Sequence, residues 1–178
     1  MMGAVLGTLA FVPFVVFEII KCRRAASGRR GANLWFALGA LLLAAGWVLS
    51  VKDSAAASWP LFATGLVIAF TGVFCYIFVL RQTSASGNYL RDEAEKVPLV
   101  SKGAYAVVRH PGIWCFAAIS AGASLMFPDA AAASLWFAFL NLIYTVLQDV
   151  YFFPVYIKGY GDYKKEVPFC IPRIWKKV

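Results

Sequence analysis

The chain has 178 residues, of which 61% are hydrophobic and 15% are charged, and its net charge is +8. A soluble domain is about half apolar and about a quarter charged, so this composition excludes an ordinary soluble globular protein and indicates one membrane domain over 1–178. The basic residues fall in loops that flank apolar stretches, which argues against nucleic acid as a partner and favours contact with anionic lipid headgroups.

We predict an all-α integral membrane fold of about five transmembrane helices, because a helix needs about 20 apolar residues to cross a bilayer. The predicted spans are 3–20, 33–51, 60–80, 111–127 and 131–156, and a C-terminal tail, 157–178, follows them. The first stretch has no basic segment ahead of it and is too long for the apolar core of a signal peptide. We therefore expect it to be a span and not a cleaved leader.

Sixteen of the 17 Lys and Arg residues fall in three places: after the first predicted span, between the third and fourth, and after the fifth. Only Lys52 lies on the opposite side. The positive-inside rule therefore predicts a multi-pass protein with its N-terminus outside and its C-terminus in the cytoplasm.

The cysteines do not predict a metal or disulfide site. Cys22, Cys75, Cys115 and Cys170 lack the paired spacing typical of zinc ligands, and the chain has one histidine to add to them. Two of the four fall in apolar spans and two on the predicted cytoplasmic side, where disulfides are rare. We expect no metal.

The single histidine, His110, lies between Arg109 and Pro111 at the start of the fourth predicted span. Proline is favoured in the first turn of a helix, because its missing N–H costs nothing there. Arg109 and His110 are therefore expected at a helix N-terminus, where backbone N–H groups and the helix dipole attract anions. The triplet predicts a small-molecule anion site on the water side. The alternative is a charged anchor that only starts a helix.

The fifth predicted span is longer than a bilayer requires, so its last turns are expected to carry Tyr144, Gln148 and Asp149 to the cytoplasmic edge. Tyr144 and Gln148 are four residues apart and share one helix face. A polar stripe beside an acid predicts a lined cavity; the alternative is a helix that has already left the membrane. Glu18, near the end of the first span, is interpreted as an interfacial partner of Lys21.

The tail combines regularly spaced aromatic residues with lysines and two prolines, Pro168 and Pro172. This pattern predicts an amphipathic helix at the membrane interface, followed by an extended piece that covers a site. The alternative is a helix that simply rests on lipid headgroups.

Two segments resemble the isoprenylcysteine carboxyl methyltransferase family and its looser relatives, the membrane phospholipid methyltransferases. The first is Leu99-Val100-Ser101-x-Gly103-x-Tyr105-x-x-x-Arg109-His110-Pro111. The second, in the tail, is Tyr160-x-x-Tyr163-Lys164-Lys165-x-Val167-Pro168 followed by Ile171-Pro172. Together the two segments cover about the C-terminal half of the chain, 97–172.

The resemblance implies S-adenosylmethionine as methyl donor, bound on the cytoplasmic side beneath the tail. The family's donor contacts fall on Val97, Pro98, Leu99, Val100, Tyr105, His110, Pro111, Gly112 and Ile113. Arg109 and His110 suit the donor's carboxylate, and the aromatic faces of Tyr105, Trp114 and Tyr144 suit its sulfonium. Gln148 is expected to hydrogen-bond the donor's ammonium or ribose.

The chain departs from the family on the last long helix. Gln148 and Asp149 stand where the family has two adjacent glutamates, and Tyr144 stands where it has an arginine. Loss of that arginine argues against an isoprenylcysteine carboxylate as acceptor, so we expect a membrane lipid or a lipophilic small molecule. For an amine acceptor, Asp149 or Tyr144 would orient the amine or take its proton; with Arg109 they are the expected catalytic residues.

Two other functions fit part of the pattern. Membrane reductases of the sterol-reductase type share a similar Arg-His-Pro ending and use a nicotinamide cofactor, but usually continue with Asn-Tyr where this chain has Gly112-Ile113. A non-catalytic family member that binds lipid would account for the altered Gln148-Asp149 pair.

Overall fold

The structure is a computed structural model that describes residues 2–23, 32–85 and 97–172. In these residues the regular elements are helices, apart from an isolated bridge between Val97 and Ile157. The basic residues Arg24, Arg29 and Arg30 lie outside the described residues, as do Arg91 to Lys96 and the end of the tail after Pro172. The helices are α1 (Met2–Leu9), α2 (Phe11–Arg23), α3 (Ala32–Val51), α4 (Trp59–Ala85), α5 (Ala104–Val107), α6 (Gly112–Met126), η1 (Pro128–Ala130), α7 (Ala131–Leu147), η2 (Gln148–Phe152), α8 (Phe153–Tyr156) and α9 (Tyr160–Glu166).

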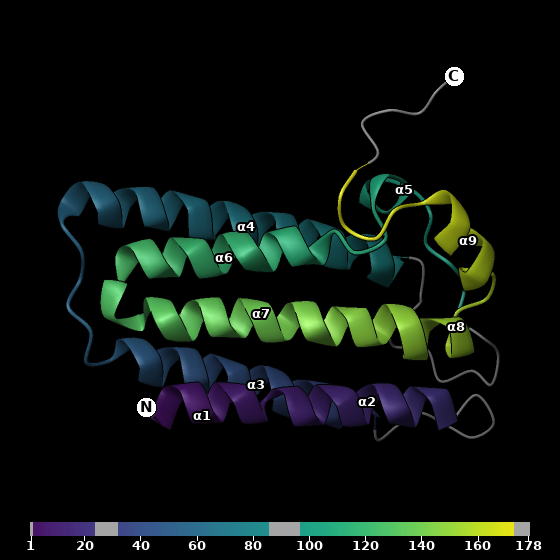
Figure 1. Cartoon of the computed structure of the whole chain (residues 1–178), viewed down its shortest axis with the longest axis horizontal. Helices are drawn as coiled ribbons and strands as arrows, with labels where there is room; N and C mark the ends of the chain where they lie inside the picture. Colours follow the sequence, from purple (N-terminus) through teal and green to yellow (C-terminus); the bar gives the residue numbers. More distant parts are fainter. Residues whose placement is uncertain (1, 24–31, 86–96, 173–178) are drawn as a thin grey trace.

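The long helices lie side by side and run back and forth along one axis (Figure 1). Helix α6 packs between α4 and α7, while α3 packs on α1 and α2, and α1 joins the two groups through α7. The short helices α5, α8 and α9 gather at the end of the bundle away from the N-terminus. This arrangement brings the Arg-His-Pro segment and the tail to the same end of the bundle.

Glycines allow α4 and α6 to pack closely against each other. Gly65 and Gly122 face each other so closely that a Cβ built on either one would lie 2.5 Å from the other's carbonyl oxygen. Small residues permit this approach between apolar helices, where packing and not water exclusion drives association. A second glycine of α4, Gly72, approaches Cys115 and Ile119 of α6 in the same way, at 2.9 Å from a built Cβ.

Four segments are long and apolar enough to cross a membrane: Met2–Arg23, Asn33–Val51, Trp59–Thr83 and Pro128–Tyr156. They correspond to four of the five predicted spans and make the chain a candidate multi-pass membrane protein. Helix α6, in the place of the predicted span 111–127, has 15 residues and is about 22 Å long. A bilayer core is about 30 Å thick, so α6 is shorter than a straight span.

Prolines interrupt two of the predicted spans. The proline ring clashes with the carbonyl four residues earlier and removes a hydrogen bond. Pro13 accordingly follows the break between α1 and α2 at Ala10, and Pro154 follows one turn of π-helix, η2, that ends α7. Such turns are frequent at functional sites, and η2 carries Gln148 and Asp149.

Candidate functional site

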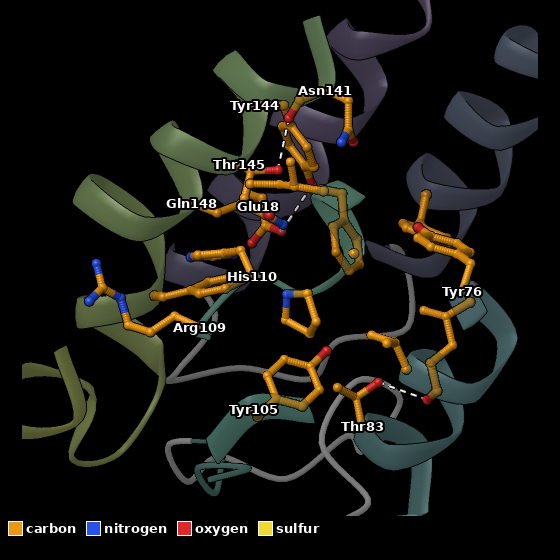
Figure 2. Close-up of a pocket in the computed structure, with 18 of the residues that line it drawn as sticks. Glu18, Tyr76, Thr83, Tyr105, Arg109, His110, Asn141, Tyr144, Thr145 and Gln148 are labelled. Atoms are coloured by element: carbon orange, nitrogen blue, oxygen red, sulfur yellow. Dashed lines mark hydrogen bonds between the residues drawn. The ribbon is translucent and has the colours of Figure 1, made fainter. Parts of the chain in front are cut away.

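A cavity of about 390 Å³ lies where α6 begins, among α2, α3, α4 and α7 (Figure 2). Its volume falls in the range of about 300–1,000 Å³ that is usual for small-molecule sites. In Figure 2, Glu18, Tyr144 and Gln148 lie on one side of it, and Tyr76 and Thr83 of α4 lie on the other. The lining residues are Phe17, Glu18, Asn33, Phe36, Tyr76, Val79, Leu80, Thr83, Tyr105, Arg109, His110, Pro111, Gly112, Ile113, Asn141, Tyr144, Thr145, Gln148 and Phe153.

The late start of α6 provides this space. Helix α6 begins at Gly112, while its neighbour α4 continues to Ala85 on the side of the short helices. Pro111 caps α6 in a helical conformation, with φ −62° and ψ −26°. Gly112 has no side chain to fill the gap, and a Cβ built on it would lie 3.5 Å from the ring of Tyr76.

The segment before α6 holds the tail. The backbone N–H groups of Arg109 and His110 donate to the carbonyls of Pro168 and Phe169, at 2.8 and 3.0 Å. The indole N–H of Trp114 donates to the carbonyl of Cys170 at 2.6 Å. Residues 167–172 and α9 therefore lie against the Arg-His-Pro segment beside the cavity.

Arg109 is committed to partners within the protein. Its Nε and Nη2 donate to the two carboxylate oxygens of Asp149, at 2.8 and 3.1 Å, and its Nη1 donates to the carbonyls of Lys164 and Val167. The side chain is 8% exposed. We expected Arg109 to attract the carboxylate of a ligand. In this structure Asp149 and the tail take that place, so Arg109 joins the end of the last span to the tail.

His110 belongs to the same cluster. Its Nε2 lies 3.1 Å from Asp149 Oδ1 and 3.2 Å from the hydroxyl of Tyr160, whose own proton goes to Asp149 at 2.6 Å. A carboxylate only accepts, so Nε2 carries the hydrogen and Nδ1 is the unprotonated nitrogen of the neutral ring. Its ring stacks on Phe153, with the centroids 5.5 Å apart.

Burial lowers the pKa of His110 below its ordinary value, against the opposing effect of Asp149. The imidazole is therefore neutral near pH 7 and does not supply the positive charge expected of the Arg-His pair. Burial also raises the pKa of Tyr105 well above its usual value, which keeps its hydroxyl protonated. His110 and Tyr105 therefore line the cavity as a neutral imidazole and a neutral phenol.

Asp149 is not among the described residues that line the cavity. The residue is 4% exposed, and its carboxylate accepts hydrogen bonds from Arg109, His110 and Tyr160. Lys164 Nζ lies 2.7 Å from its Oδ2. Burial and the bond to Asp149 raise the pKa of Tyr160 far above its usual range, so that tyrosine donates as a neutral hydroxyl. That Asp149 acts on a substrate stays a prediction; in this structure its carboxylate binds side chains of the protein.

The four residues Val97, Pro98, Leu99 and Val100 line a separate small pocket of about 40 Å³. Val97 is 5% exposed and packs with Tyr156, Tyr160 and Tyr163 in a hydrophobic cluster. A space of this size holds no more than a few water molecules, so the pocket that the described residues form here is smaller than a nucleoside requires. Tyr105 and Arg109 line both pockets.

The structure brings eight of the 13 predicted site residues to the large cavity. These are Tyr105, Arg109, His110, Pro111, Gly112, Ile113, Tyr144 and Gln148. Trp114, which we expected to face a sulfonium, is 55% exposed and lies outside the lining that the described residues form.

Glu18 lines the cavity, whereas its position in the sequence indicates an interfacial partner of Lys21. Its side chain is 0% exposed, and it accepts hydrogen bonds from Tyr144, Gln148 and Tyr156. Its partners lie 126 to 138 residues away in the sequence. The available signal was a glutamate within an apolar span, which is costly to keep without a role.

Comparison with known proteins gives no relative: no family model, curated protein or solved structure matches the chain.

Proposed function

We propose that the chain is an integral-membrane methyltransferase that uses S-adenosylmethionine. The observation that carries the proposal is the cavity of about 390 Å³, whose lining includes eight residues predicted from the sequence, five of them donor contacts implied by the family resemblance. Residues far apart in the chain, such as Tyr105 and Gln148, line the same cavity. A charged anchor that only starts a helix would not require this convergence.

The lining suits the chemical parts of such a donor. Aromatic faces such as Tyr76 and Tyr105 suit an adenine ring or a sulfonium. The amides of Asn33 and Asn141 and the hydroxyl of Thr145 offer hydrogen bonds for a ribose or a base. The 15-residue helix α6 begins at the cavity, and its positive end suits the donor's carboxylate.

The bound donor would supply an activated methyl group, which transfers by direct displacement. The protein's part is to hold an acceptor in line with that group and to exclude water. The tail, tied to Arg109, His110 and Trp114, covers this end of the bundle and provides the exclusion. Neutral His110 and Tyr105 offer hydrogen bonds without adding charge beside the reacting atoms.

The acceptor we propose is a membrane lipid or a lipophilic small molecule, met on the cytoplasmic side. The cavity lies within helices that are long and apolar enough to span a membrane, so an apolar acceptor need not leave the lipid phase. The basic residues Lys102, Lys158 and Lys165 flank the same end, which the positive-inside rule assigns to the cytoplasm. An isoprenylcysteine carboxylate is disfavoured, because Tyr144 provides no positive charge for it.

Titration of the purified full chain in detergent with S-adenosylmethionine and with its demethylated product tests the proposal. We expect both compounds to bind with measurable heat and to raise the unfolding temperature. Absence of heat and of any thermal shift at millimolar ligand would overturn it. Stabilisation by NADPH in place of these compounds would identify a reductase instead.

A further inference from the structure

We infer that Glu18 recognises a cation: its carboxylate takes a positively charged group, an ammonium or a sulfonium, of the molecule that fills the large cavity. The inference rests on the proposed function for the identity of that molecule. The existence of the cation site can be tested without it.

The position of Glu18 is the first observation. It lies in the segment Met2–Arg23, which is long and apolar enough to cross a membrane, and it is 0% exposed to solvent while it lines the cavity. A carboxylate in a membrane helix is expensive, and those that persist face a cavity or a partner. Glu18 borders the cavity, and hydrogen bonds from Tyr144 and Gln148 hold its carboxylate there.

The hydrogen bonds of Glu18 are the second observation. Tyr144 and Gln148 donate to its Oε1 at 3.0 and 2.7 Å, and Tyr156 donates to its Oε2 at 2.7 Å. These three donors are neutral, so they fix the direction of the carboxylate without cancelling its charge. The donors belong to α7, η2 and α8, so three other helical elements fix the orientation of a side chain of α2.

The charges around the cavity are the third observation. Among the described lining residues, Arg109 is the cation, and its guanidinium is bound through two hydrogen bonds to Asp149. Lys21 lies one turn from Glu18, but it lines the small pocket, with its ammonium 4.8 Å from the centre of the Tyr156 ring. The large cavity therefore presents a carboxylate together with aromatic faces, and both attract cations.

This arrangement selects among ligands. A carboxylate acceptor placed beside Glu18 would meet a like charge in a site of low dielectric, which is unfavourable. An amine acceptor, or the ammonium or sulfonium of the donor, would gain a charge-assisted interaction at the same place. The shared chemistry is a cationic nitrogen or sulfur next to apolar surface.

The experiment compares the full chain with Glu18→Gln and with Glu166→Gln, an exposed glutamate on α9 that serves as matched control. Binding of octylamine, which is cationic at pH 7, is measured against octanol, which is neutral, by thermal unfolding in detergent. S-adenosylmethionine and its demethylated product are titrated into the same three proteins. A double variant, Glu18→Gln/Gln148→Glu, exchanges the two side chains that share the 2.7 Å hydrogen bond, so the carboxylate moves to position 148.

We expect Glu18→Gln to bind at least one cationic probe about 10- to 100-fold more weakly than wild type, the range for a lost charged hydrogen bond. Octanol binding and Glu166→Gln stay unchanged, and the double variant recovers part of the loss. If S-adenosylmethionine and its demethylated product both bind more weakly, the ammonium that they share lies at Glu18. If only S-adenosylmethionine binds more weakly, its sulfonium lies there. Weakening of octylamine alone assigns the site to an amine acceptor.

A folded Glu18→Gln protein that binds every cationic probe as wild type does would overturn the inference, and Glu18 would then only tie α2 to α7. If Glu18→Gln does not fold, the double variant carries the test: folded protein without a preference for octylamine overturns it equally. Wild type that prefers octylamine but binds neither nucleoside refutes the proposed methyl donor and keeps the cation site.

Discussion

Arg109 and Asp149, which are 40 residues apart in the sequence, share two hydrogen bonds of 2.8 and 3.1 Å in a buried, bidentate ion pair. Arg109 lies directly before α6, and Asp149 lies in the π-helical turn at the end of α7. The remaining guanidinium hydrogens bind the carbonyls of the tail. One arginine therefore joins the start of α6, the end of the last span and the tail.

Neutralising Asp149 leaves the buried Arg109 guanidinium without its counter-charge, and removing Arg109 leaves the buried Asp149 carboxylate with the partly exposed Lys164 as its remaining cation. We expect Arg109→Ala and Asp149→Asn each to lower the free energy of unfolding by about 3–5 kcal/mol, the usual cost of breaking a buried pair. Chemical denaturation in detergent measures this. The matched control is Lys165→Ala, which breaks the exposed pair with Asp162 and should leave stability unchanged. Equal effects of the buried and exposed changes would refute the role of Arg109.

The pH dependence of stability should report on His110. Burial lowers its pKa in the folded protein below the ordinary 6.5, so the unfolded chain binds more protons in this range. Its contribution is therefore fully present above pH 6.5 and is lost as the pH falls toward the folded pKa, at up to about 1.4 kcal/mol per pH unit.

Since the chain has one histidine, the substitution His110→Gln should flatten the stability profile between pH 5 and 7. Unfolding midpoints at several pH values in that interval check this. Stability of the wild type that rises as the pH falls below 6.5 would contradict a neutral, buried His110.

Gly159, directly before α9, has a left-handed backbone conformation. Gly159 has φ +74°, a conformation that costs other residues about 1–2 kcal/mol, and a Cβ there would meet no atom within 4 Å. We expect Gly159→Ala to destabilise the protein by about 1 kcal/mol through backbone strain alone. Gly161→Ala is the matched control, because Gly161 lies within α9 and its Cβ is also free of contacts. That change should be neutral or stabilising; the same loss at both positions would contradict the assignment of strain.

The indole of Trp114 anchors the tail at Cys170. Trp114→Phe removes the 2.6 Å hydrogen bond to the Cys170 carbonyl, and we expect the Cys170 thiol to react about 5- to 10-fold faster with a water-soluble maleimide, as for the loss of one hydrogen bond of about 1 kcal/mol. Mass spectrometry of the labelled peptide gives the rate. Trp59→Phe, an exposed tryptophan at the start of α4, should leave the rate unchanged. An unchanged rate in Trp114→Phe would show that the tail is held elsewhere.

The sequence predicts the local parts of this site well. Proline at 111 marks where α6 begins, and the neighbouring Tyr105, His110 and Gly112 line the cavity because they flank that start. Their identification depends on short-range spacing and on motif resemblance, and both are readable along the chain.

Long-range partners could not be read in the same way. Arg109 and Asp149 were each identified, but nothing in their spacing shows that they neutralise each other. Glu18 was assigned to its neighbour Lys21, while its hydrogen bonds reach Tyr144 and Tyr156 across the bundle. The π-helical turn had a signal in Pro154, whose ring disturbs the carbonyl one turn earlier. Helix α6 is as short as the predicted span 111–127, because Pro111 marks its start and the backbone N–H groups of residues 109 and 110 bind the tail.

The most direct measurement is equilibrium binding of radiolabelled S-adenosylmethionine to the full chain and to Gly112→Phe. Gly112 lines the cavity opposite Tyr76, so a phenylalanine there occupies the space proposed for the donor. Ile171→Phe, at a site that is 71% exposed, is the control. We predict saturable binding by wild type and by Ile171→Phe, and its loss in folded Gly112→Phe. Wild-type protein that binds no donor, or Gly112→Phe that binds it as tightly as wild type, would contradict the assignment of this cavity.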